Sequence, residues 1–187
     1  MALPDISTDR YTTREEYERM VSRGVFDGRR VELVQGIIYE MTPQNSLHAS
    51  SIRRVRRVLE EIHPEDCDVD IQMPLSVGLD SSPEPDLAVV RRNPSEYIEG
   101  HPESALLVVE IADSSLRRDR KKAAVYAQAG VDDFWIVNLG RDVLEVYREP
   151  VDGAYRTRLI LRRGERITPL LRPDVSLAVD DLLPRNI

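Results

Sequence analysis

The chain has 187 residues, the size of one ordinary domain, and its 41% hydrophobic and 32% charged residues are typical of a globular protein. This balance excludes an intrinsically disordered chain, and the apolar runs are far too short for a membrane-spanning helix. A net charge of −7 argues against general coating of nucleic acid, although local basic surfaces stay open. The single cysteine excludes an internal disulfide, and residues 1–10 lack the apolar segment of a secretory signal, so we predict a cytoplasmic protein.

The first third of the chain predicts a helix, a hairpin and a second helix. An N-cap signature in residues 12–16 starts a helix that ends at Gly24. The apolar runs 31–34 and 37–41 flank a Gln-Gly turn, which predicts a β-hairpin. Apolar residues recurring every three or four positions predict a helix over 46–62. Four basic side chains on its opposite arc are weak candidates for phosphate contacts: Arg53, Arg54, Arg56 and Arg57.

The remainder of the chain predicts further strands with one helix among them. The expected strands are residues 68–77, 87–90, 106–111 and 134–137, the expected helix is 116–130, and a C-terminal hairpin is expected over 143–148 and 155–161. No repeat or long linker divides the chain, so we predict a single domain over residues 1–187. The fold class is α/β (α+β), a mixed β-sheet flanked by helices with a β-hairpin near each end.

Two carboxylates fall in or beside apolar strand segments. Asp86 directly precedes one such run, and Glu110 lies inside another after four apolar residues. Burial of an ionised carboxylate costs several kcal/mol, so a partner is expected for Glu110. That partner is either a metal ion or a basic side chain in a structural ion pair, and Asp86 could instead be an ordinary turn residue. The pattern alone leaves these alternatives open.

A hard divalent cation would suit these two acids. Mg²⁺, or Mn²⁺ in its place, is bound by one or two carboxylates with waters and substrate phosphate. Asp86 and Glu110 could supply the carboxylates, with the backbone carbonyl near Ile111 as a further ligand. Lys122 on the following helix could hold the attacking water or a phosphate oxygen. Glu32 could join the metal shell, or it could face outward and pair with a neighbouring arginine.

Two weaker candidates complete the set. His48 stands near a helix start, where histidine is more often a surface or capping residue, and Gln72 lies on the strand expected before Asp86. The three histidines lack zinc-ligand spacing, and one cysteine cannot build a zinc site. The chain also lacks a Gly-rich phosphate loop and a dinucleotide fingerprint, so no organic cofactor is expected.

Several segments in a fixed order make the chain similar to a known family. The segments are RVELVQGIIYEM (30–41), PDL (85–87), VVEIADSS (108–115), YAQAGV (126–131) and FWIV (134–137). Together they resemble the Uma family, a bacterial group of restriction endonuclease-like proteins placed in the PD-(D/E)XK nuclease superfamily. The resemblance covers about residues 11–183 and implies a restriction-endonuclease-like core with acidic residues gathered at one end of the sheet.

The resemblance also implies roles for the candidate residues. Asp86 corresponds to the motif aspartate, Glu110 to the second acid and Glu32 to the helper acid of the first motif. The superfamily lysine is expected two positions after the second acid, where Ala112 stands in this chain. The family resemblance places that lysine on the following helix, which makes Lys122 the candidate.

The family pattern also bears on the interpretation of two further residues. The segment between residues 117 and 122 is slightly short for the family, so Lys121 is an alternative for the lysine. Gln72 occupies a place where the family often has glutamine.

These observations predict a Mg²⁺-dependent phosphodiesterase acting on DNA. Double-strand cleavage would favour a two-fold homodimer, with one active site per strand. The rival prediction is a catalytically silent nucleic-acid-binding or regulatory module that keeps the fold. A carboxylate acid–base enzyme such as a glycosidase is a third option, disfavoured by the nearby lysine and by the scarcity of Trp and Phe.

Overall fold

The computed structural model describes residues 10–184. Its helices are α1 (Arg14–Ser22), α2 (Ser46–Ile62), α3 (Leu116–Gln128) and the short α4 (Val179–Leu182). Its strands are β1 (Val31–Val34), β2 (Ile37–Glu40), β3 (Cys67–Ile71), β4 (Leu87–Arg91), β5 (Leu107–Ala112), β6 (Asp133–Asn138), β7 (Val143–Val151), β8 (Ala154–Arg162), β9 (Arg166–Ile167) and β10 (Leu177–Ala178).

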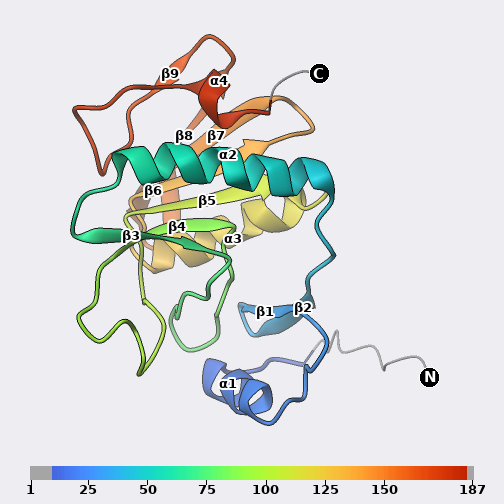
Figure 1. The fold of residues 1–187 in the computed structure, drawn as a ribbon. Coiled ribbons are helices and arrows are strands. Elements are labelled where there is room, and N and C mark those ends of the chain that lie inside the picture. Colours follow the sequence, from blue (N-terminus) through green and yellow to red (C-terminus); the bar gives the residue numbers. More distant parts are fainter. Residues whose placement is uncertain (1–9, 185–187) are drawn as a thin grey trace.

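A six-stranded mixed sheet forms the centre of the molecule. Its strand order is β3-β4-β5-β6-β7-β8, and only β5 and β6 run parallel. Helix α3 is the crossover between these two parallel strands. Helix α2 lies across one face of the sheet and α3 across the other (Figure 1). The predicted mixed sheet flanked by helices is confirmed, as are the hairpins towards both ends.

The alternation of side chains along the strands divides the core into two clusters. On β4, Leu87 and Val89 pack with the apolar stripe of α2, whereas Ala88 and Val90 pack with the cluster that contains α3 residues. Both faces of the central strands are therefore buried, which explains why the sequence there is almost continuously apolar.

The N-terminal elements pack together below the main sheet. The β1–β2 hairpin turns at Gln35 and Gly36, whose φ angles are both positive, as a two-residue type I′ turn requires. A side chain at position 36 would also meet the ring of Tyr11, with a Cβ only 2.3 Å from its nearest atom. Leu33 exchanges backbone hydrogen bonds with Ser82 at 2.7 and 3.3 Å, which joins the hairpin to the segment before β4.

One predicted strand is shorter than the sequence pattern indicated. The sequence predicts a strand over 68–77, but β3 ends at Ile71 because Gln72 adopts a left-handed conformation with φ +52°. Pro74 follows and lacks the N–H group that a strand ladder needs. Met73 is therefore exposed rather than in line with a buried face. That part of the prediction is wrong, because the apolar alternation continues past the end of the strand.

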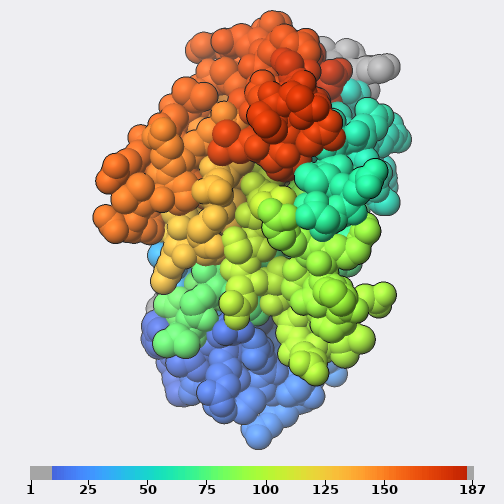
Figure 2. Space-filling model, turned by 90° about the vertical axis from the view of Figure 1, so that its left-hand side faces the viewer, coloured from blue at the N-terminus to red at the C-terminus, as the bar shows by residue number. Residues whose placement is uncertain are grey.

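The C-terminal segment packs beside α2, on the same side of the central sheet. Strands β7 and β8 form a hairpin longer than predicted, with its turn at Asp152 and Gly153. The chain then passes through β9 and β10 into α4, which contacts α2. Figures 1 and 2 both place this segment at the opposite end of the molecule from α1 and the β1–β2 hairpin. The sequence did not predict these last elements, which are only two to four residues long.

A buried polar network lies on β7, away from the predicted site residues. Glu145 is 1% exposed and receives hydrogen bonds from Arg120, Asn138, Tyr147 and Arg158 at 2.5 to 3.1 Å. Burial alone would raise the pKa of Glu145, but these hydrogen bonds, with that of Arg120 the largest, lower it to about 2. In residues 10–184, no helix has the length and apolar character needed to cross a membrane.

Candidate active site

The candidate site lies where β5 ends, between α3 and the β1–β2 hairpin. Val108 and Ala112 belong to the cluster that contains α3 residues, so Glu110 between them points towards the same side. Its side chain is almost fully buried. Lys122 and Tyr126 lie four residues apart on α3 and share one buried helix face, which meets Glu110.

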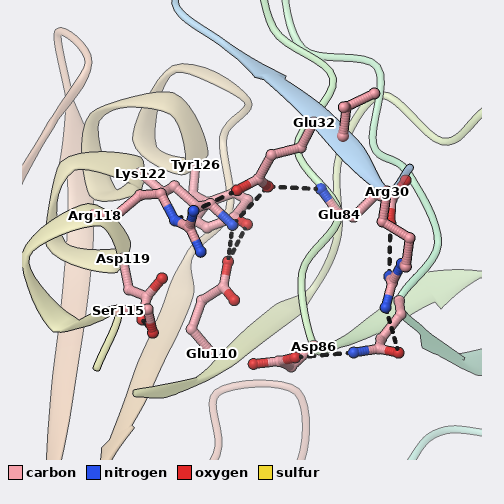
Figure 3. A network of polar contacts seen from close by, with 12 residues as sticks. Arg30, Glu32, Glu84, Asp86, Glu110, Ser115, Arg118, Asp119, Lys122 and Tyr126 are labelled. Atoms are coloured by element: carbon pink, nitrogen blue, oxygen red, sulfur yellow. Dashed lines mark hydrogen bonds and ion pairs between the residues drawn. The ribbon is translucent and has the colours of Figure 1, made fainter. Parts of the chain in front are cut away.

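The ammonium group of Lys122 links two buried carboxylates (Figure 3). Lys122 Nζ lies 2.7 Å from Glu32 Oε2 and 3.0 Å from Glu110 Oε1. The hydroxyl of Tyr126 donates to the same Glu110 oxygen at 2.6 Å, and the backbone N–H of Glu84 donates to Glu32 Oε2 at 3.2 Å. The hairpin, the central sheet and α3 therefore meet at one charged group.

Asp86 is held at the entrance to β4 by three groups. The backbone N–H of Ile111 donates to Asp86 Oδ2 at 2.8 Å, His48 Nε2 lies 3.0 Å from the same oxygen, and the Gln72 amide donates to Oδ1 at 3.3 Å. Burial disfavours the charged form of His48, but the hydrogen bond and the charge of Asp86 outweigh it and raise the pKa of His48. In a strand, the N–H and C=O of one residue point to the same side, so the Ile111 carbonyl faces the Asp86 side of β5.

Arg30 fixes the orientation of the Gln72 amide. Its guanidinium donates to Gln72 Oε1 at 3.3 Å and to Glu84 at 2.8 Å. With the amide oxygen facing this donor, the amide nitrogen is left to donate to Asp86. The contacts therefore run from Arg30 through Gln72 to Asp86, and Figure 3 labels Arg30 and Asp86 at the two ends of this chain.

Burial and crowding of charge shift the pKa values in the cluster. Burial raises the pKa of Glu110 to about 8, with the charges of Asp119, Asp86 and Glu32 adding to the effect and Lys122 opposing it. Burial alone would lower the pKa of Lys122, but Glu110, Glu32 and Asp119 outweigh it, so this pKa is raised. The lysine is therefore charged, whereas burial and the neighbouring carboxylates oppose the ionisation of Glu110 and Lys122 favours it.

Asp119 is a further buried carboxylate beside the cluster. It lies three residues before Lys122 on α3, is 3% exposed and accepts a hydrogen bond from the Ser115 hydroxyl. Burial raises the pKa of Asp119 to about 6, although the charge of Lys122 and the Ser115 hydrogen bond act in the opposite direction. Asp86 contributes to the increase, which indicates that the two aspartates lie close enough to repel each other.

One pair of buried polar atoms in the site is incompletely satisfied. Glu32 Oε1 and Arg118 Nε lie 3.7 Å apart, and neither forms a hydrogen bond with any residue in the 10–184 segment. Buried atoms of this kind usually have a partner, so they indicate a position that a water or ligand atom can fill.

The chemistry of the donor set fits a small hard cation. A cavity of about 70 Å³ adjoins Asp86, Glu110 and Asp119, which is room for an ion and one or two waters. One oxygen of Glu110 is held by Lys122 and Tyr126, and the other forms no hydrogen bond within the described residues. Within residues 10–184, no three His, Cys, Asp or Glu side chains form a ready-made metal cage. A site with two carboxylates, one carbonyl and open positions for water is the type that Mg²⁺ prefers.

The structure brings most of the predicted residues together and leaves others outside. Glu32, Gln72, His48 and Ile111 all contact one of the two predicted acids or Lys122. Lys121 is exposed on the next face of α3 and forms no ion pair within the described part of the chain. The arginines at positions 53–57 line neither the cavity nor the cluster.

Sequence reasoning missed several members of the site. Arg30 and Glu84 approach it from loops, and no periodic pattern marks them. Asp119 and Tyr126 carried a usable signal, because residues three before and four after Lys122 share its helix face. Arg118 is one of several basic residues on α3, and nothing in the sequence separates it from the others.

The fold is that of the restriction-endonuclease-like class. The Uma2 family model, described as "Putative restriction endonuclease", matches residues 14–180, so the chain belongs to this family. Among solved structures, a "putative nuclease belonging to DUF820" from Anabaena variabilis ATCC 29413 is similar, with a TM-score of 0.72 and 16% sequence identity. The match covers 91% of this chain and 96% of that one, and at this identity it shows a shared fold. No match is found among the curated proteins.

Proposed function

We propose that the protein is a Mg²⁺-dependent nuclease that hydrolyses phosphodiester bonds in DNA, with Mn²⁺ able to replace Mg²⁺. The observation that carries the proposal is the convergence of Lys122 with Glu32 and Glu110, next to Asp86 and a cavity of about 70 Å³. Membership of a family described as restriction endonucleases supports the same reaction class.

Asp86, Glu110 and the carbonyl of Ile111 would hold the metal ion. When bound, the ion would lower the pKa of a coordinated water and neutralise charge on the phosphate. The protein's own part is to fix these ligands in place. Tyr126 and Lys122 occupy one oxygen of Glu110 and leave the other for the ion, while the Ile111 N–H anchors Asp86.

Lys122 would act on the phosphate or the attacking water through its charge. An ammonium group has three N–H donors, and Glu32 and Glu110 account for two of them. The third can donate to a phosphate oxygen or to the water. Because the pKa of Lys122 is raised, the group keeps its proton and serves as an electrostatic clamp rather than a base.

Cleavage of DNA by matched variants tests the reaction. Wild-type protein is expected to cut DNA with Mg²⁺ or Mn²⁺, and Asp86→Asn or Glu110→Gln to lower the rate on the order of a hundredfold or more. Asp70→Asn is the control, because Asp70 is a partly buried aspartate on β3 outside the catalytic cavity. A wild-type protein that binds DNA but never cuts it with either metal would establish the catalytically silent module instead.

Calorimetric titration with Mn²⁺ tests the metal ligands separately. Asp86→Ala and Glu110→Ala are expected to weaken Mn²⁺ binding, whereas Asp70→Ala leaves it unchanged. Equal affinities in wild type, Asp86→Ala and Glu110→Ala would remove both residues from the metal site, whatever the cleavage assay shows.

A two-fold homodimer is the assembly proposed for double-strand cleavage, since one active site would then face each strand. Light scattering of the protein during double-strand cleavage tests it. A protein that stays monomeric while it makes double-strand breaks would refute the dimer and leave the chemistry of the site untouched.

A further inference from the structure

A basic groove opens directly beside the catalytic cavity. Its volume is about 460 Å³, compared with about 70 Å³ for the cavity. Arg117, Arg118 and Lys121 of α3 line it, with Tyr39 of β2 as a further lining residue, and none of its lining residues is acidic. Three cations without an acid form an unusual local surface on a chain whose net charge is −7.

The groove and the cavity are continuous. Thr42, Ser114, Ser115 and Arg118 line both of them, so a molecule lying in the groove would lead into the cavity. In the hairpin register, Tyr39 stands directly opposite Glu32, and paired residues of this kind have side chains on the same face. One wall of the groove is therefore next to the residue that holds the catalytic lysine.

Two of the three cations of the groove are free to bind an anion. Arg117 and Lys121 are both exposed, and neither forms an ion pair with any residue between 10 and 184. The position of Arg117 also disfavours the helix, because it lies in the first turn of α3, where the helix dipole repels positive charge. Residues that cost helix stability without an internal partner are expected where a function retains them.

We propose that this groove binds the phosphodiester backbone of the DNA strand beside the phosphate that is cleaved. Arg117 and Lys121 would contact phosphates of the strand, and Arg118 stands at the junction with the cavity. These contacts place the strand without reading its sequence. Tyr39 would lie beside a sugar or base of the bound strand, since it lines the same groove. The inference rests on the proposed function, because it takes the strand to lead into the same catalytic cavity.

The salt dependence of DNA binding tests the groove. A labelled short duplex is titrated with wild-type protein and with Arg117→Gln/Lys121→Gln in Ca²⁺, and the dissociation constant is followed against salt concentration. In a plot of the logarithm of the association constant against the logarithm of the salt concentration, each lost phosphate contact makes the slope shallower by about 0.7 to 0.9. The slope of the double variant should therefore be shallower than that of wild type by about 1.4 to 1.8. Near 0.1 M salt, the DNA affinity of the double variant should fall roughly 20- to 60-fold, and the factor should be similar for duplexes of unrelated sequence.

Two comparison variants make the result specific. Arg156→Gln/Arg162→Gln removes a pair of exposed arginines from β8 that line neither the groove nor the cavity. We expect it to keep the wild-type slope. Arg117→Lys/Lys121→Arg keeps both charges and should keep the slope as well, which separates loss of phosphate contacts from damage to α3.

Three outcomes would overturn the inference: an unchanged slope in Arg117→Gln/Lys121→Gln, an equal loss in the β8 pair, or a loss in the charge-keeping pair. Failure of the proposed function looks different. In that case, Asp86→Asn would leave cleavage unchanged, whereas failure of the groove alone would leave the Asp86→Asn effect in place.

Discussion

Replacement of Lys122 by methionine should destabilise the protein far more than the same change at its neighbour Lys121. Lys122 is 2% exposed and is the cation between two buried carboxylates, at 2.7 Å from Glu32 and 3.0 Å from Glu110. Removing one partner of a buried ion pair leaves an uncompensated charge and costs about 3–5 kcal/mol. For a domain of this size, 1 kcal/mol lowers Tm by about 2–4 °C, so the expected fall is about 6–20 °C.

Thermal unfolding followed by circular dichroism measures the effect, with Lys121→Met as the matched control. Lys121 is exposed and lacks an ion-pair partner in the described residues, so its change should remain within about 0.5 kcal/mol. The deficit of Lys122→Met should shrink on acidification, because protonation can neutralise the stranded carboxylates. Equal Tm values for the two variants would refute the reasoning, since the ammonium group would then contribute nothing to the cluster.

Three further predictions concern the stability of the fold. The pKa of Glu145 is lowered from its ordinary value of 4.5 to about 2, so its ionised form stabilises the fold fully above pH 4.5 and this stability is lost as the pH falls towards 2. In urea unfolding, the free energy of unfolding of Glu145→Gln should therefore fall less steeply than that of wild type as the pH is lowered from 4.5 towards 2. Gly36→Ala should lower the unfolding free energy by more than about 1 kcal/mol, because φ is +76° and Tyr11 fills the space, and a Tm equal to wild type would contradict this. Asn45→Ala should cost about 1 kcal/mol by calorimetry, because the Asn45 side chain caps α2 at the His48 N–H, and no loss would show that the cap is dispensable.

The local elements of the fold were predictable because they depend on short-range patterns. The type I′ hairpin follows from Gln35 and Gly36, and the buried face of α2 follows from an apolar repeat of three or four. The end of β3 was not predictable, because alternation continues through residues that the left-handed Gln72 removes from the strand. The β9, β10 and α4 elements are too short to carry any periodic signal.

The site was predictable where a charged residue stands within an apolar stretch of sequence. Glu110 stands among apolar residues, and the structure pairs it with a buried lysine on the next helix. Asp119 shares the helix face of Lys122 and could have been found from that spacing, whereas Arg118 is one of several charged residues on α3 and no pattern marks it. Their roles depend on how far α3 is rotated against the hairpin, which only tertiary packing decides.

Helix α3 explains how the lysine can stand so far along the chain from the second acid. Ala112 is fully buried in the apolar cluster that includes Val125, so a lysine there would bring a charge into the core. Lys122 enters from the helix instead, and its ammonium reaches Glu110 directly. The neighbouring face of the same helix carries Lys121 into the basic groove. One helix would then serve both catalysis and strand binding, so a rotation of α3 should impair both together.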